Sequence, residues 1–122
     1  MEKNKVVITS AYRTAVGTLG KSLKNIEAHE LGAKIISETL KKSQIKKEEI
    51  DEIILGQVLT GGAGQNPARQ AAINAGLPIE KPAYIVNQVC GSGLRSVCFG
   101  YQSILLGDSK ISLCGGHESM SK

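Results

Sequence analysis

Residues 84–106 read YIVNQVCGSGLRSVCFGYQSILL. Tyr84 to Val89 is predicted as a strand, Cys90-Gly-Ser-Gly93 as a turn, and Gly93 to Leu106 as a helix. Within the helix, apolar side chains recur at three- and four-residue spacing and predict a single apolar face: Leu94, Val97, Cys98, Tyr101, Ile104 and Leu105. A strand that leads through a short glycine turn into a helix is typical of α/β proteins.

Working outward from this unit, the rest of the chain repeats the same alternation. Further strands are predicted at Val6–Ile8, at Glu52–Leu59, which is apolar enough to be buried on both faces, and at Ile111–Cys114. Helices are predicted at His29–Ser43 and from Asn66-Pro67 to Gly76, with a helical turn near Lys47–Ile50. The connecting segments are predicted as loops, at 13–25, 60–65 and 77–82. We therefore expect an α/β fold, with layered helices around a mixed, mostly parallel sheet that is incomplete in this chain.

Composition excludes several classes of protein. The chain has 122 residues, of which 41% are hydrophobic and 21% are charged, as in ordinary globular domains. Its longest apolar runs have three residues, far below the roughly 20 that a membrane-spanning helix needs. The net charge of +4 comes from residues 1–50, where Lys41, Lys42, Lys46 and Lys47 precede a cluster of acids. We interpret this as the junction of two helices, and we expect no nucleic-acid or membrane partner.

The cysteine count and the N-terminal sequence indicate the cellular compartment of the protein. Three cysteines cannot form a disulfide framework, and Met1–Ala11 lacks the apolar core of a secretory signal. We therefore expect a cytoplasmic protein with reduced thiols.

Cys90 is the candidate nucleophile. It lies between a predicted strand and a predicted helix, where unpaired backbone N–H groups and the helix dipole stabilise an anion. The same N–H groups are suited to an oxyanion that forms when a carbonyl is attacked. The alternative is a small buried residue that fills a strand–helix junction. Cys98 and Cys114 are predicted as core residues, since each falls on an apolar face.

Other candidate sites are weaker. Cys114 and His117 have zinc-ligand spacing, but Cys90 and Cys98 lie about 12 Å apart along one helix and cannot complete the site, so no metal is expected. The glycine-rich loop at 61–64 lacks the pattern of a phosphate loop. His29 is predicted at the surface, and for His117 a polar role stays open.

Four stretches resemble the thiolases, a family of acyl-CoA C-acyltransferases. They are Val86-Asn-Gln-Val-Cys90-Gly-Ser-Gly93, Arg13-Thr14 with Gly17, Gly64-Gln-Asn-Pro-Ala-Arg69, and Gly115-Gly-His-Glu-Ser-Met-Ser121. Together the matches cover residues 6–122, and the stretches that contain Arg69 and Cys90 look most like the acetoacetyl-CoA thiolase branch. The resemblance implies an N-terminal thiolase domain at 1–122, without the loop domain and the C-terminal half.

The resemblance also implies a mechanism and a set of site residues. Cys90 would take an acyl group from an acyl-CoA, and a second acetyl-CoA would attack it; the reverse is thiolytic cleavage of a 3-oxoacyl-CoA. Asn87, Gly91, Ser92 and Gly93 would support the turn that presents Cys90. A dimer interface is implied at Gln65, Asn66, Arg69, Tyr84, Ile85 and Val86. No cofactor is expected, and the implied partners are acyl-CoA, CoA, further copies in a homodimer or homotetramer, or a complementary C-terminal chain. The implied setting is fatty acid metabolism.

Three elements of the thiolase pattern are not found in the sequence: the Asn-Glu-Ala-Phe segment, the Gly-His-Pro histidine that activates the nucleophile, and the Cys-x-Gly-Gly-Gly cysteine that acts as acid and base. We therefore expect little or no activity from this chain alone. Two alternatives stay open: a non-catalytic half-domain that binds CoA or pairs with a partner, and a condensing enzyme of the ketoacyl synthase type.

Overall fold

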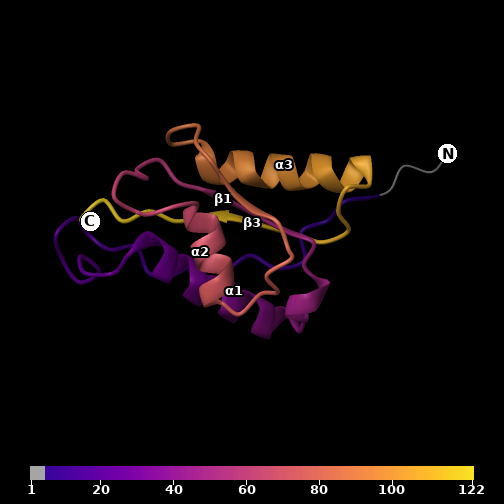
Figure 1. Ribbon diagram of the computed structural model, residues 1–122, viewed down its shortest axis with the longest axis horizontal. Helices are drawn as coiled ribbons and strands as arrows, with labels where there is room; N and C mark the ends of the chain where they lie inside the picture. The colour runs from indigo at the N-terminus through magenta and orange to yellow at the C-terminus, as the bar shows by residue number, and fades with distance from the viewer. Residues whose placement is uncertain (1–4) are drawn as a thin grey trace.

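The computed structural model describes residues 5–122 as alternating helices and strands (Figure 1). In chain order the elements are α1 (Ala28–Ser43), the 3-10 helix η1 (Lys47–Glu49), β1 (Glu52–Gly56), α2 (Pro67–Asn74), β2 (Ala83–Val86), α3 (Ser92–Leu106) and β3 (Ser112–Gly116). The predicted alternation is confirmed from residue 28 onward. Residues 1–4, part of the segment searched for a secretory signal, lie outside the described residues.

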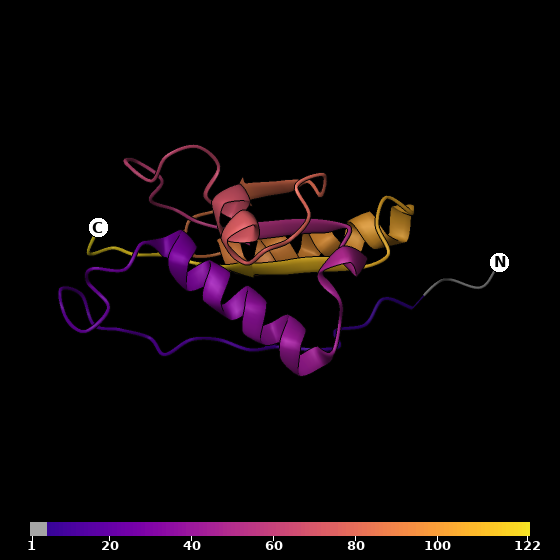
Figure 2. The ribbon, with the colours of Figure 1, turned by 60° about the horizontal axis from the view of Figure 1, so that its bottom comes forward.

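The three strands form one parallel sheet in the order β2-β1-β3. In its register, Ile54 of β1 lies between Tyr84 of β2 and Cys114 of β3. Helix α3 covers one face of the sheet, whereas α2 covers the other face and α1 packs against α2 (Figure 2). This arrangement confirms an α/β fold with a parallel sheet. None of the helices within residues 5–122 has the length and hydropathy needed to cross a bilayer.

The core lies between the sheet and the helices α1 and α2. Alternate residues of β1, Ile53 and Leu55, point into it, and the apolar stripe of α1 and the alanines of α2 meet them there. Its buried members are Ala33, Ile36, Leu40, Ile50, Ile53, Leu55, Ala68, Ala71, Ala72, Ala75, Leu77 and Ala83. The many alanines let α2 lie close to both α1 and the sheet.

On the opposite face, α3 contacts the sheet through small residues. Its buried positions are Ser92, Ser96 and Gly100, which recur every four residues along one side of the helix. The Ser96 hydroxyl lies 2.8 Å from the Gly115 carbonyl oxygen of β3 and 2.6 Å from the Gly93 carbonyl oxygen. At Gly56 a side chain would not fit, because a Cβ there would lie 2.6 Å from the Gly93 nitrogen. The start of α3 therefore rests directly on the end of β1.

The predicted apolar face of α3 turns away from the sheet. Leu94 is 73% exposed and Tyr101 is 51% exposed, while Cys98 is half-buried. The prediction that Cys98 is a core residue is wrong, because the small-residue face of α3, rather than its apolar face, packs against the strands. Cys114 is also half-buried rather than part of the core.

The predicted strand at Val6–Ile8 does not form. Residues 5–19 have no regular secondary structure, and Ile8 is 76% exposed. A cavity of about 1330 Å³, lined by residues 5–19 and by α1, α3 and β3, separates this segment from the sheet. A strand needs a paired neighbour, and residues 5–19 form no hydrogen-bonded pair with any of the three strands within residues 5–122, because the cavity lies between them and β3.

The strand ends also differ from the predictions. β1 ends at Gly56 rather than Leu59, because the Val58 and Leu59 N–H groups donate to the Glu118 carboxylate instead of to a neighbouring strand. β2 occupies Ala83–Val86 rather than 84–89, because the Val89 N–H donates to the Asn87 side chain. β3 begins and ends slightly later than predicted, at Ser112–Gly116.

Candidate active site

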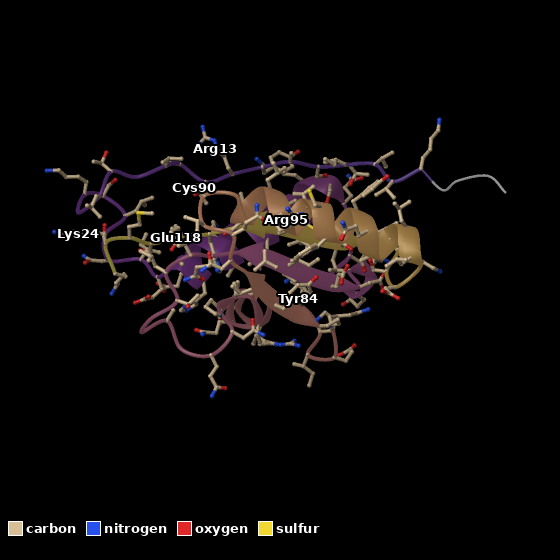
Figure 3. All side chains as sticks on the ribbon, turned by 90° about the horizontal axis from the view of Figure 1, so that it is seen from above. Arg13, Lys24, Tyr84, Cys90, Arg95 and Glu118 are labelled. Atoms are coloured by element: carbon tan, nitrogen blue, oxygen red, sulfur yellow. The ribbon has the colours of Figure 1, made fainter. Side chains whose placement is uncertain are left out.

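Cys90 lies in the five-residue turn between β2 and α3, and its side chain is exposed. Figure 3 shows it just before the start of α3, with Arg95 on that helix. Because the first residues of α3 rest on Gly56 and Gly116, the turn lies at the edge where the parallel strands β1 and β3 end. In open α/β sheets this carboxyl edge is where ligands bind.

Ser92 closes the turn from the helix side. Its hydroxyl donates to the Val89 carbonyl oxygen at 2.6 Å and accepts the Gln88 N–H at 2.8 Å. The Ser92 N–H also donates to the Val89 carbonyl, and the Gly91 N–H donates to the Gln88 carbonyl at 2.9 Å. These bonds involve the Val89 carbonyl before Cys90 and the Gly91 N–H after it, and they fix the path of the backbone through Cys90.

Val89 has an unusual backbone conformation. Its φ of 48° lies in the left-handed region, which a β-branched residue adopts only at a steric cost. The Asn87 side chain accepts the Val89 N–H at 3.0 Å, and its amide nitrogen donates to the Val58 carbonyl at 3.3 Å. The surrounding hydrogen bonds thus hold a strained residue immediately before the candidate nucleophile, a combination that is concentrated at functional sites.

Arg95, near the start of helix α3, contacts the turn that carries Cys90. Its Nε donates to the Gln88 side-chain oxygen at 2.6 Å, and its guanidinium lies 5.8 Å from the centre of the Phe99 ring. The Arg95 side chain therefore links the turn to the helix.

The structure brings together the residues predicted to support the turn. Asn87 and Ser92 bond within it, Gly91 occupies the N-cap position of α3, and Gly93 contacts Gly116 of β3. Sequence reasoning assigned no role to Gln88, Arg95 or Glu118. For Glu118 a signal was present, since it is an acid placed just after the Gly-Gly pair that ends an apolar strand. Gln88 and Arg95 carry no comparable local signal.

Cys114 and His117, unlike the exposed Cys90, lie in largely buried surroundings. Burial, reinforced by the nearby Glu52 carboxylate, raises the pKa of the Cys114 thiol to about 11, so this cysteine stays protonated at neutral pH. Burial lowers the pKa of His117 to about 4; His29 lowers it further, whereas Glu118 and the Ala28 backbone oppose the shift. His117 is thus neutral at pH 7, and neither ring nitrogen has a hydrogen bond within residues 5–122. It packs against Gly32 of α1 rather than facing the Cys90 turn.

Within residues 5–122 no three His, Cys, Asp or Glu side chains are grouped closely enough to hold a metal ion. His29 lies in the first turn of α1, where it is half-buried.

The candidate interface residues lie around β2, an edge strand. Asn66 caps α2 by accepting the Arg69 N–H and donates to the Ala83 carbonyl of β2 at 2.9 Å. Tyr84 is 38% exposed, and Ile85 and Val86 are half-buried. Gln65 lies in the loop before α2. The bond between Asn66 and Ala83 thus links the start of α2 to the edge strand β2.

Comparison with known protein families identifies the family to which the chain belongs. The family model described as the thiolase N-terminal domain matches residues 6–122. The chain belongs to the thiolase family. The thiolase resemblance of the sequence is therefore confirmed.

Individual thiolases agree with this assignment. The chain is 54% identical to an acetyl-CoA acetyltransferase of Rhizobium meliloti over 99% of its own length and 31% of that protein. It is 49% identical to the cytosolic acetyl-CoA acetyltransferase of Mus musculus over 96% of its length and 30% of that protein. The crystal structure of the acetyl-CoA acetyltransferase of Bacillus anthracis superimposes with a TM-score of 0.91 and 36% identity, over 95% of this chain and 29% of that one. The chain thus spans about a third of the length of these relatives.

Proposed function

We propose that the polypeptide carrying these residues is an acetyl-CoA C-acetyltransferase in which Cys90 accepts the acyl group. The observation that carries the proposal is the exposed Cys90 thiol on a fixed turn at the carboxyl edge of the sheet, inside a thiolase domain. The relatives with the same domain are named acetyl-CoA acetyltransferases, which supports acetyl-CoA as the substrate.

In the proposed reaction the Cys90 thiolate attacks the thioester carbonyl of acetyl-CoA. A tetrahedral oxyanion forms and collapses into an acetyl-cysteine thioester, and CoA leaves as a thiolate that takes up a proton. A second acetyl-CoA then loses a proton from its methyl group, and the resulting carbanion attacks the acetyl carbon. Acetoacetyl-CoA is released and the Cys90 thiol is restored; the reverse sequence is thiolysis of a 3-oxoacyl-CoA.

The turn offers donors for the oxyanion. The Gly91 and Ser92 N–H groups are used inside the turn, whereas those of Cys90 and Gly93 have no acceptor within residues 5–122. N–H groups fixed at a helix N-terminus stabilise a developing negative charge. The histidine and the second cysteine that the family pattern assigns to proton transfer are not among these residues. We therefore expect the 122-residue chain alone to have little or no turnover.

The experiment uses the longest gene product that carries this chain. After brief exposure to acetyl-CoA, mass spectrometry of its peptides should find the acetyl group on Cys90. Cys90→Ser should abolish acetylation, and the matched control Cys98→Ser should leave it unchanged. Acetylation that persists in Cys90→Ser would refute the proposed nucleophile.

A second candidate function is pairing with a complementary chain. The cavity between residues 5–19 and β3, together with the exposed apolar side of α3, favours it, since both are surfaces of the kind that a further layer covers. We infer that further thiolase sequence covers them, in the same polypeptide or in a C-terminal partner chain. Native mass spectrometry of the 122-residue chain with and without such a chain tests this; a strict monomer in both samples would count against it.

Two finer points extend the proposal. We propose that subunits of the complete enzyme pair along the edge formed by β2 and the start of α2, giving a homodimer or homotetramer. We also propose a cytoplasmic location, which the three free cysteines and the cytosolic mouse relative support, and a place in fatty acid metabolism. No observation favours the ketoacyl synthase alternative.

A further inference from the structure

Glu118 forms an unusual long-range contact beside the Cys90 turn. It lies two residues after β3, and each of its carboxylate oxygens accepts one backbone N–H: Val58 at Oε2 and Leu59 at Oε1, both at 2.8 Å. These partners are 60 and 59 residues away in the sequence. Such charge-assisted bonds are about twice as strong as neutral ones, so Glu118 holds the segment after β1 firmly.

The segment held by Glu118 in turn holds the Cys90 turn. The Val58 carbonyl accepts a hydrogen bond from the Asn87 side-chain nitrogen, and the Asn87 oxygen accepts the Val89 N–H. Since both ends of the Asn87 amide are occupied, its orientation is fixed. A continuous path of hydrogen bonds therefore runs from the Glu118 carboxylate through Val58 and Asn87 to the residue before Cys90.

The last residue of this path is the strained one. Val89 has φ of 48°, a conformation that persists only where neighbouring groups enforce it. Ser92 holds its carbonyl and Asn87 holds its N–H. The Ser92 contact is local, whereas the Asn87 contact depends on where Val58 lies, and hence on Glu118.

We propose that Glu118 is a positioning residue for the acyl-transfer reaction. By fixing Val58 it aims the Asn87 amide, which holds Val89 in the left-handed conformation and so directs the Cys90 thiol toward the bound thioester. This inference rests on the proposed function, in which Cys90 is the acyl acceptor. Glu118 itself does not touch substrate.

The test measures steady-state thiolysis of acetoacetyl-CoA by the longest gene product that carries this chain. Glu118→Gln keeps the shape of the side chain but turns an NH2 group toward one of the two N–H donors. We expect kcat to fall by about tenfold or more with KM nearly unchanged, because misplacement of a reacting group by a fraction of an ångström to 1 Å has effects of this size. Glu80→Gln, a change at an exposed acid outside the path, is the matched control and should leave kcat unchanged.

A double-mutant cycle separates positioning from general destabilisation. Asn87→Asp keeps the acceptor for the Val89 N–H but loses the donor to Val58, so it should resemble Glu118→Gln. The double variant should be no slower than the slower single variant, because both changes break one path. If Glu118→Gln does not fold, the kcat of Asn87→Asp alone decides whether this path positions Cys90.

Two results would overturn the inference: additive losses in the cycle, or a normal kcat in a folded Glu118→Gln or Asn87→Asp variant. Cys90→Ser distinguishes this failure from failure of the proposed function. If Cys90→Ser abolishes acetylation while Glu118→Gln has normal kcat, only the positioning role is wrong. If Cys90→Ser is still acetylated, the proposed nucleophile is wrong as well.

Discussion

Residues 5–19 and residues 87–91 both lack regular helix or strand structure, yet they are held in opposite ways. The turn at 87–91 is bonded to itself, to α3 through Ser92 and Arg95, and to the segment after β1 through Asn87. Residues 5–19 form no hydrogen bond to a strand within residues 5–122, and the Lys42 ammonium of α1 lies over the Tyr12 ring, 4.8 Å from its centre. Their apolar side chains face solvent or the cavity.

The difference shows what each kind of segment requires. The Cys90 turn is held by side chains a few residues away, Asn87 and Ser92, and by the longer contact between Asn87 and Val58. An extended apolar segment that is buried needs a neighbouring strand, because its backbone N–H and C=O groups must find partners away from water. The backbone of the Cys90 turn is therefore fixed by hydrogen bonds, whereas residues 5–19 pair with no strand within residues 5–122.

The largest expected effect comes from separating the turn from the sheet. Gly56→Ala would place a Cβ 2.6 Å from the Gly93 nitrogen and 2.7 Å from the Ser92 Cβ, so the start of α3 must move. We expect the free energy of unfolding to fall by about 3 kcal/mol, measured by urea denaturation of the 122-residue chain. Gly61→Ala, where the added Cβ meets open space, is the matched control and should change stability by less than about 0.5 kcal/mol. Equal midpoints for the two variants would contradict the close approach.

The next effect concerns His117, which borders the cavity beside residues 5–19. Its pKa is about 4 in the folded chain against an ordinary value of 6.5, so the unfolded chain binds the extra proton first as pH falls. The contribution of His117 to stability should be fully present above pH 6.5 and decline between pH 6.5 and about 4, by a total of about 3 kcal/mol.

Urea midpoints measured across this pH range check the expectation for His117. His117→Gln should flatten the decline, whereas His29→Gln, the other histidine, should keep it. The range stops near 4 because two backbone N–H groups lower the pKa of Asp51, whose protonation adds a separate loss of stability below its ordinary pKa of 3.8. An unchanged slope in His117→Gln would show that other groups cause the decline.

The smallest effect tests the strain in the turn directly. Val89→Asn replaces a β-branched residue at φ of 48° by one that adopts this conformation readily. Since Val89 is 64% exposed, little packing is lost, and we expect a gain of about 1 kcal/mol and a rise in Tm. The matched control is Val16→Asn, in residues 5–19, because the φ of Val16 is not positive. Its stability should change by less than about 0.5 kcal/mol. A loss of stability in Val89→Asn would mean that the side chain has a packing role.

Much of the fold could be predicted from the sequence because the signals were local. The stripe of Leu31, Ile35, Ile36 and Leu40 predicted α1, and Asn66-Pro67 predicted the start of α2. Cys90 was recognised as a candidate because a strand, a glycine turn and a helix follow one another. Each of these features is determined by residues that are close to one another in the sequence.

The errors have a common cause in contacts between distant residues. Val58 and Leu59 look like a continuation of β1, but Glu118 takes their N–H groups. The periodicity of α3 revealed two faces without showing which one meets the sheet, and a row of Ser92, Ser96 and Gly100 gives the closer fit. The left-handed Val89 has no signature in the residue itself, since only its surroundings enforce it.

The long sequence separation between Glu118 and Val58 also has an entropic consequence. The hydrogen bond between the Ser92 hydroxyl and the Val89 carbonyl joins residues three positions apart, whereas the bond between Glu118 and Val58 joins residues 60 positions apart. Because the entropy lost in closing a loop grows with its length, the Glu118 contact costs more chain entropy than the contacts inside the turn. It therefore depends on the pairing of β3 with β1, and local opening of β3 would release Val58 while leaving the bond between Ser92 and Val89 in place.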